Sequence, residues 1–368
     1  MASFDEVLKD CTKLGTKIPT SEYLENGKYP IIDQGQNDIA GYYDSDGGLF
    51  EDVPTIVFGD HTRVVKYVDK PCFLGADGVK LLCPVDKDIN CKYLFYQLSC
   101  ADIPNTGYNR HFKWVKALNF KIPSSDEQNH VVEVLDKVTS LIFLRKQQIA
   151  KLDELVKARF FEMFGEISDN SMNWDCFTIG ELISTIESGW SGNGKQREKH
   201  ADEIAVLKVS AVTKGYFIPT ECKVLDDQHN IKKYVYPQKG DILFSRANTK
   251  EMVGATVLIK KDYPDLILPD KLWKIRFCTD VNPIYMKHVL STTTVRNAFS
   301  AASTGTSGSM YNVSMEKFKG VIIPVPPLPV QNEFAAFVER VDKQKQTVQQ
   351  SLEKLELMKK ALMQEYFG

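Results

Sequence analysis

A long internal repeat constrains the fold of this chain more than any other feature. Residues 118–165 recur as residues 321–368 after a shift of 203 positions, the separation of Gln128 from Gln331, and the two copies align without a gap. The whole chain is therefore predicted to consist of two copies of one unit. Each copy has a globular part followed by a tail.

Each tail has the sequence pattern of a coiled-coil helix. Apolar residues follow one another in alternating steps of four and three, which is the heptad pattern. Neither tail contains a proline after Pro123 or Pro329, and we expect the helices to start behind these two residues. The predicted seam residues are Val131, Leu135, Val138, Ile142, Ile149, Leu152 and Val156 in the first helix, and Phe334, Val338, Val341, Val348, Leu352, Leu355 and Leu362 in the second.

A seam this narrow cannot be buried by one helix alone, so the two helices are predicted to pair with each other. About 40 helical residues would make a rod of about 60 Å. Antiparallel pairing would relate the two globular parts by a pseudo-twofold axis. The plain alternative is a pair of rigid spacers with no further role, and the in-register repeat weighs against it.

The globular parts indicate an α+β fold in which two similar mixed α/β domains are each followed by one long helix. Residues 29–32, 55–58, 64–68 and 79–82 are β-like runs separated by glycine-containing turns, and residues 91–98 have helical spacing. The expected division of the chain is a first domain at 1–122, a first spacer helix at 123–165, a second domain at 166–326 and a second spacer helix at 327–368.

Composition places the chain among ordinary globular proteins, with 43% hydrophobic and 26% charged residues. No run approaches the roughly 18 apolar residues of a membrane span, and the first residues form no basic, apolar leader, which predicts a cytoplasmic protein. The eight cysteines are scattered without Cys-x-x-Cys spacing. Reduced thiols are therefore expected, and no metal site.

The formal net charge of −2 limits what a nucleic-acid-binding surface can look like in this chain. Proteins that bind DNA often carry a surplus of Lys and Arg. Any DNA-binding face must therefore be a local patch, balanced by acidic residues elsewhere, such as those on the predicted helices.

Polar loop residues are the candidates for such a patch, because Asn and Gln pair with adenine, Arg with guanine, and Lys or Thr with phosphate or thymine. For each residue alone, an ordinary solvated loop position is the competing interpretation, and Tyr108 also suits a core position. The candidates in the first domain are Gln34, Gln36, Asn37, His61, Thr62, Arg63, Lys66, Tyr108, Asn109, Arg110 and His111.

The second domain has its densest polar segment at residues 189–200, where three glycines stand beside basic residues. Such a segment is predicted to be a mobile basic loop that follows phosphates, and a plain surface loop is the alternative. The candidates here, with those of two further loops, are Lys195, Gln196, Arg197, Lys199, Ser245, Arg246, Asn248, Lys250, Ser307 and Tyr311.

Motifs that would indicate an enzyme are missing from the sequence. Asp60 and His61 are adjacent, but no Ser or Cys nucleophile motif accompanies them. The six histidines show no metal spacing, and no Asp/Asn-Pro-Pro-Phe/Tyr methyltransferase tetrad is present. No catalytic residue is therefore predicted.

The chain resembles the DNA-specificity subunits of type I restriction-modification systems over essentially its full length. The resemblance is carried by the doubled tails with Gln128-Asn129 and Gln331-Asn332, by residues 240–246, and by residues 56–63 with 75–80. No single motif is decisive, but the doubled architecture is specific. In that family each globular domain is a target-recognition domain that reads one half of a split double-stranded DNA sequence.

The resemblance also implies partners. Two modification subunits, which carry S-adenosylmethionine and methylate adenine, would dock on the helices and adjoining surfaces, and restriction subunits using ATP and Mg would complete the complex. No cofactor would be bound by this chain itself. Two alternatives remain: a coiled-coil adaptor with two domains for ligands other than DNA, and an enzyme-like chain, either the specificity portion of a fused modification or restriction enzyme or an isolated nuclease.

Overall fold

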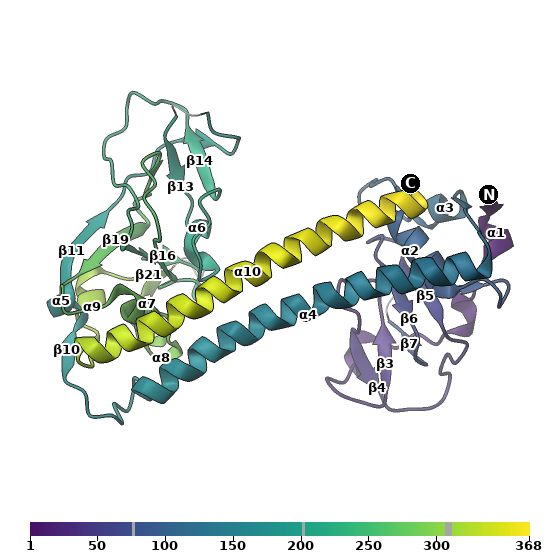
Figure 1. Ribbon diagram of the computed structural model, residues 1–368, viewed down its shortest axis with the longest axis horizontal. Helices are drawn as coiled ribbons and strands as arrows, with labels where there is room; N and C mark the ends of the chain where they lie inside the picture. Colours follow the sequence, from purple (N-terminus) through teal and green to yellow (C-terminus); the bar gives the residue numbers. More distant parts are fainter. Residues whose placement is uncertain (76–77, 201–202, 306–310) are drawn as a thin grey trace. The chain divides into compact units, whose positions relative to one another are not determined.

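The computed structural model describes residues 1–75, 78–200, 203–305 and 311–368. The chain folds into two compact units (Figure 1): unit 1 comprises Met1–Gln148 and Val348–Gly368, and unit 2 comprises Ile149–Thr347. Each unit contains one globular part and a portion of both long helices. Among the described residues, no helix is long and apolar enough to cross a membrane.

Unit 1 is a mixed α/β domain whose described residues form two larger sheets and the two-stranded pair β1-β9. One sheet has the strand order β2-β8-β5-β6, and the other has the order β4-β3-β7, with β3 and β7 parallel. Its elements are β1 (Ala2–Ser3), α1 (Phe4–Val7), β2 (Leu8–Asp10), β3 (Tyr29–Ile32), β4 (Gly41–Tyr43), β5 (Thr55–Gly59), β6 (Val65–Val68), β7 (Phe73–Leu74), β8 (Val79–Pro84), α2 (Cys91–Cys100), α3 (Phe112–Lys116) and β9 (Asn119–Phe120), with short 3-10 turns at Thr12–Leu14 and Thr20–Glu22.

Unit 2 repeats this plan. Its elements are β10 (Cys176–Thr178), α5 (Ile179–Leu182), β11 (Ile183–Ser188), β12 (Gly194–Lys195), β13 (Ala205–Leu207), α6 (Ser210–Thr213), β14 (Cys222–Leu225), β15 (Ile242–Ser245), β16 (Ala247–Asn248), β17 (Thr256–Leu258), β18 (Leu266–Ile267), β19 (Leu272–Phe277), α7 (Pro283–Ser291), α8 (Thr293–Ala302), β20 (Thr304–Gly305), β21 (Tyr311–Asn312), α9 (Met315–Lys319) and β22 (Ile322–Pro324).

The two units share one strand topology. The sheet β11-β19-β15-β17 of unit 2 matches β2-β8-β5-β6 of unit 1, and β14-β13-β18 matches β4-β3-β7, again with the last pair parallel. Unit 2 adds strand β12 on the edge of the second sheet and a further small sheet, β16-β21-β20. The predicted repeat of a mixed α/β scaffold is therefore confirmed.

The long helices are α4 (Ser125–Phe164) and α10 (Leu328–Phe367). Helix α4 starts two residues behind Pro123, as expected, whereas α10 starts one residue before Pro329 rather than behind it, and one residue after the expected boundary at 327. Pro329 is the second residue of α10. Proline is tolerated in the first helical turn because the N–H that it lacks would have no partner there.

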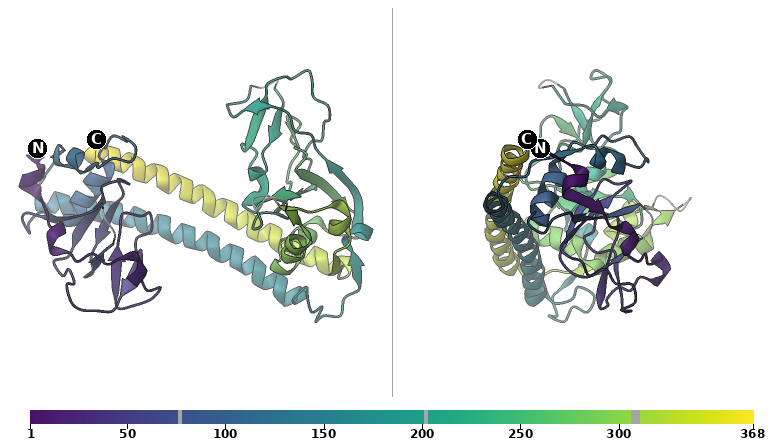
Figure 2. Two further views of the ribbon diagram at one scale, coloured as in Figure 1. Left: turned by 180° about the vertical axis from the view of Figure 1, so that it is seen from behind. Right: turned by 90° about the vertical axis from the view of Figure 1, so that its right-hand side faces the viewer.

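In unit 1 the first part of α4 lies beside the last part of α10, against α2 (Figure 2). Val131 and Leu135 of α4 pack with Leu362 of α10 and with the aromatic residues of α2. Further along α4, Lys146 forms an ion pair with Glu356, 3.1 Å apart. Contacts further along α4 involve earlier residues of α10, so the two segments run antiparallel in this unit.

The complementary segments pair in the same way in unit 2. Arg159 Nη2 lies 2.8 Å from Glu333, and Lys345 Nζ lies 2.6 Å from Asp153. Between these ion pairs, Val156 packs into the core of the unit together with residues of α10. Every predicted seam residue in both helices is buried or half-buried.

The repeated Gln-Asn pair at the start of each long helix has a structural role. In unit 1 the Gln128 side chain accepts a hydrogen bond from the backbone N–H of Asn90 (2.9 Å) and donates one to the carbonyl of Pro123 (2.9 Å). The Asn90 side chain in turn donates to Asn129. Since Asn90 caps the first turn of α2, this clamp fixes the start of α4 to the start of α2.

Unit 2 contains the same clamp. Gln331 is fully buried, accepts from the N–H of Asn282 (2.8 Å) and donates to the carbonyl of Pro326 (2.8 Å), while the Asn282 side chain donates to Asn332 (2.8 Å). Asn282 is the N-cap of α7, the counterpart of α2.

Candidate nucleic-acid interface

In unit 1, the loops that carry most of the predicted residues converge on Asp60, which directly follows β5. Its backbone N–H donates to the carbonyl of Gly78 (2.7 Å), and its own carbonyl accepts from the N–H of His111 (2.8 Å). The buried carboxylate accepts from the N–H of Phe112 (2.7 Å). Asp60 therefore joins the loop after β5 to the turn before β8 and to the loop before α3.

A fourth loop, which follows β3, joins the same place. Thr62 donates its hydroxyl to the carbonyl of Gln34 (2.6 Å), and the N–H of His61 donates to the Gln34 side chain (3.2 Å). Gly78 has φ +89°, and a Cβ there would lie 2.7 Å from the His61 ring, so glycine is required. We refer to residues 33–37, 59–63, 78 and 105–111 as the unit 1 loop junction.

Most of the predicted contact residues of unit 1 present surface at this junction. Gln36, Asn37, Thr62, Tyr108, Asn109 and Arg110 are exposed, and Gln34, His61 and Arg63 are half-buried. The surface therefore offers amides, a hydroxyl, an imidazole, a phenol and a guanidinium. These are groups that hydrogen-bond to base edges and phosphates.

Two predicted contact residues of unit 1 are buried instead, and the prediction was wrong for them. The Lys66 side chain is buried in β6, where its ammonium donates to the carbonyl of Asn37 and lies 3.2 Å from Asp33. His111 has no exposed surface, and its Nδ1 lies 2.9 Å from the carbonyl of Asp60. Both side chains hold the junction loops together because burial requires their polar atoms to be paired.

Unit 2 has a corresponding junction around Arg246, which directly follows β15. Its N–H donates to the carbonyl of Lys271 (3.1 Å) and its carbonyl accepts from the N–H of Val313 (2.9 Å), which are the same two links that Asp60 makes. The guanidinium donates to the carbonyl of Asp270 (2.9 Å). The hydroxyl of Ser188 also donates to that carbonyl (3.2 Å).

The predicted residues of this second junction differ in exposure. Lys250 is exposed, and Arg246, Asn248 and Tyr311 are half-buried. Ser245 was wrongly predicted as a contact residue, since it is fully buried in β15 and accepts at 3.4 Å from the Asn248 side chain. Ser307 lies outside the described residues.

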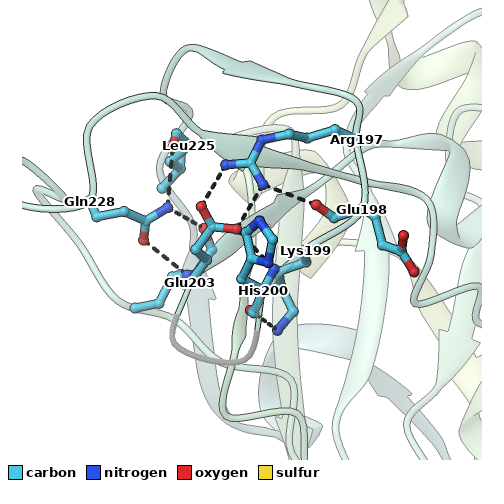
Figure 3. A network of polar contacts seen from close by, with 8 residues as sticks. Arg197, Glu198, Lys199, His200, Glu203, Leu225 and Gln228 are labelled. Carbon is cyan, nitrogen blue, oxygen red and sulfur yellow. Dashed lines mark hydrogen bonds and ion pairs between the residues drawn. The ribbon is translucent and has the colours of Figure 1, made fainter.

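The glycine-containing basic loop of unit 2 is tied by ion pairs (Figure 3). Arg197 donates two hydrogen bonds to the carboxylate of Glu203, and Lys199 lies 2.8 Å from Asp265. The side chain of Gln196 accepts from Lys208 (3.1 Å). The expectation of an unrestrained basic loop is corrected accordingly, because the charges of Arg197 and Lys199 are compensated within the protein.

Arg197 also controls the ionisation of its partner. Hydrogen bonds from the Arg197 guanidinium, together with one from the N–H of His200, lower the pKa of Glu203 from 4.5 to about 2. Glu203 therefore stays ionised at neutral pH. Lys195, on the exposed edge strand β12, forms no ion pair among the described residues.

Helix α3 carries basic residues that sequence reasoning missed. It begins directly after the unit 1 junction, and Lys113 and Lys116 are exposed on it. Lys113 lies 5.3 Å from the ring of Trp114, which is itself partly exposed. The repeat could have indicated Lys116, because the 203-residue shift that aligns the tails also aligns it with Lys319.

A second missed group lies in unit 2 on the segment before β15. Lys232, Lys233 and Tyr234 are exposed, and Lys233 donates to the carbonyl of Ser188 next to the unit 2 junction. No motif marks this segment in the sequence. The hydrogen bond from Lys233 to Ser188 links it to the site.

Comparison with known proteins defines the class. The family described as "Type I restriction modification DNA specificity domain" matches the chain twice, over residues 5–154 and over residues 172–357. The chain therefore belongs to the type I restriction-modification DNA specificity family. This agrees with the resemblance seen in the sequence.

Individual relatives are distant in sequence. The Escherichia coli EcoEI specificity subunit is 26% identical over 170 residues, which span 46% of this chain and 29% of that protein. The EcoKI specificity subunit of Escherichia coli strain K12 is 25% identical over 239 residues, 61% of this chain and 50% of that one. The EcoR124I/EcoR124II specificity subunit is 20% identical over 360 residues, 88% and 82% of the two chains. The chain thus spans half or less of the first two relatives.

Solved structures support the fold. The type I restriction-modification S subunit from M. genitalium superposes with a TM-score of 0.62 and 13% identity, covering 100% of this chain and 95% of that one. A chain from a structure titled for complex assembly and conformational transition of the type I R-M system gives a TM-score of 0.51 with 15% identity, covering 98% and 94%.

Proposed function

We propose that this chain is the DNA-reading subunit of a type I restriction-modification enzyme. Each loop junction binds one half of a split double-stranded DNA target. Helices α4 and α10 set the gap between the two halves, and the chain itself performs no catalysis.

One observation supports this proposal above the others. Both units build the same junction on the same strand topology, with the same two backbone links at Asp60 and at Arg246. The side chains at the two junctions differ, since His61 and Thr62 of unit 1 correspond to Ala247 and Asn248 of unit 2. A rigid scaffold with interchangeable loops suits a protein that reads two unlike half-sites.

The long helices and adjoining surfaces are the proposed docking sites for two modification subunits. Large apolar side chains are exposed on the part of each helix that belongs to unit 1, where burial by a partner would remove them from water. They are Leu141 (44% exposed), Phe143 (59%), Leu144 (55%), Leu357 (68%) and Met358 (50%). The modification subunits would supply S-adenosylmethionine and methylate adenine, and restriction subunits with ATP and Mg would join the complex.

Methylation mapping tests the proposal directly. The chain is expressed together with a type I modification subunit from its own genomic neighbourhood, and the host DNA is sequenced by a single-molecule method that detects N6-methyladenine. The expected result is a bipartite motif with two unlike halves and a fixed gap, absent when the chain is omitted. An assembled complex that adds no methylation would contradict the proposal and favour the adaptor alternative.

A further inference from the structure

Tyr108 is unusually exposed for a large side chain. It is 87% exposed, more than any other large apolar residue that the structure describes. Its ring is nevertheless ordered by a neighbour, because it stacks on the His61 ring with the centroids 4.7 Å apart and the planes 9° apart. One face of the tyrosine is therefore covered by an imidazole, and its exposure leaves the other face open.

The loop that carries Tyr108 is held by its own hydrogen bonds. The N–H of Gly107 donates to the Asn105 side chain (3.1 Å), the N–H of Asn109 donates to the carbonyl of Gly107 (2.8 Å), and the Asn109 side chain donates to the carbonyl of Thr106. Gly107 has φ +79°, which only glycine adopts readily. Tyr108 is therefore presented by a preorganised turn.

His61 is positioned as firmly as the tyrosine. Its N–H donates to Gln34, and its Nδ1 lies 3.2 Å from the carbonyl of Asn109, the residue after the tyrosine. Since a carbonyl only accepts, Nδ1 carries the proton in this arrangement. The two rings thus form a fixed platform within the unit 1 loop junction.

Burial cannot explain this platform, because the tyrosine contributes almost nothing to the core. Preordering an aromatic ring lowers the entropic cost of binding a flat partner. Nucleobases are such partners, and each base stacked on an aromatic side chain contributes about 1–3 kcal/mol to binding. Tyr311, its counterpart in the repeat, is half-buried in β21 and packs against the core of unit 2 instead.

We infer that Tyr108 stacks on a nucleobase of the half-site bound by unit 1, at a position where the duplex is locally unstacked. This inference rests on the proposed function and adds a specificity-determining residue to it. The base would continue the stack that His61 and Tyr108 begin. Pyrimidine–purine steps unstack most readily, so the contacted base is expected at such a step.

The test uses the full chain assembled with its modification subunit, and duplexes that contain the mapped target with 2-aminopurine at successive positions. The methylated adenine is left unlabelled, because methyltransferases flip their target base. The wild-type complex should raise the fluorescence at one or more positions of the unit 1 half-site. Tyr108→Ala should abolish that rise and weaken binding of the target about tenfold, while Tyr108→Phe should preserve both.

Tyr216→Ala is the matched control. Tyr216 is also exposed (59%), but it belongs to unit 2 and lies outside the loops assigned to the interface. This variant should leave the fluorescence in the unit 1 half-site unchanged.

Three results separate the hypotheses. A Tyr108→Ala complex that binds and unstacks the target like wild type would overturn the inference and leave the proposed function standing. Equal weakening for target and scrambled duplexes, with no 2-aminopurine response in wild type, would also overturn it. A wild-type complex that does not distinguish target from scrambled DNA would instead contradict the proposed function.

Discussion

At the scale of single residues, the Gln-Asn pair shows how a repeated motif that looks functional acts as a structural clamp. Gln128 and Gln331 each connect a helix-capping asparagine to a proline carbonyl at the start of a long helix. Buried amides are stabilising only when their hydrogen bonds are complete. The pair therefore couples each long helix to its own globular part.

Replacing Gln331 by leucine should destabilise the chain. The change leaves the Asn282 N–H and the Pro326 carbonyl without their partner, at a cost of about 1–3 kcal/mol for each buried group. Denaturant unfolding of the complex-free chain measures the loss. Gln346→Leu, at an exposed position of the same helix, is the control. Equal unfolding midpoints for the two variants would show that the clamp does not stabilise the fold.

His288 should make the stability of unit 2 depend on pH. Its ring packs against Phe334 (ring centroids 5.1 Å apart) and Phe160 (6.1 Å). Burial, and secondarily the charge of Lys287, lowers the pKa of His288 from 6.5 to about 3. Below pH 6.5 the unfolded chain binds a proton that the folded chain excludes, so the stability falls as the pH falls.

Thermal unfolding of wild type and His288→Phe between pH 6.5 and 5 tests this expectation. The melting temperature of wild type should decrease over that range, and that of the variant should decrease less. The Arg197–Glu203 pair does not interfere, because the stability that it contributes is lost only as the pH falls below 4.5, the ordinary pKa of a glutamate. Parallel curves for the two proteins would mean that His288 does not carry the effect.

At the scale of elements, α4 and α10 each contribute residues to both units, which makes them the proposed spacer. The seam continues through both helices with alternating steps of four and three, so one heptad can be added without changing which residues face the partner helix. Their antiparallel pairing in each unit means that both helices must be lengthened together.

Inserting one heptad at facing positions of both helices should widen the gap in the DNA target without changing either half-site. One heptad adds about 10 Å of helix, against ~3.4 Å per base pair, so a widening of about one to three base pairs is expected. Methylation mapping reads the gap directly. Altered half-site bases with an unchanged gap would contradict the spacer role. A heptad inserted in α4 alone should disrupt assembly and serves as the comparison.

At the scale of the whole molecule, the duplicated plan makes each unit a candidate for independent exchange. The two units share a topology, and their junctions use the same backbone links with different side chains. The loops would then determine which DNA sequence each unit binds, and the fold would provide the common scaffold that positions them.

Exchanging residues 166–326 for the corresponding part of a family member should change one half of the methylated motif only. The other half and the gap should persist, because the unit 1 junction and both helices are untouched. Single-molecule methylation sequencing of the hybrid measures all three. A simultaneous change in both halves would show that the two units do not read DNA independently.

The sequence alone determined the architecture of this protein. The 203-residue repeat, the heptad seam and the absence of proline after Pro123 and Pro329 predicted two mixed α/β domains with two long helices, because periodicity and proline placement act locally. The family resemblance was likewise visible in those segments. Helix α10 starts one residue before Pro329 and not behind it, because proline is allowed inside a first turn.

Only the tertiary structure decided which polar residues reach the surface. In the sequence, Lys66, His111 and Ser245 resemble the predicted contact residues around them, yet they are buried. The charges of Arg197 and Lys199 are compensated by Glu203 and Asp265. The exposure of the lysines on α3 and the stacking of Tyr108 on His61 could not be predicted from the sequence either. Burial and ion pairing depend on which distant segments meet, and a pattern of neighbouring residue types does not contain that information.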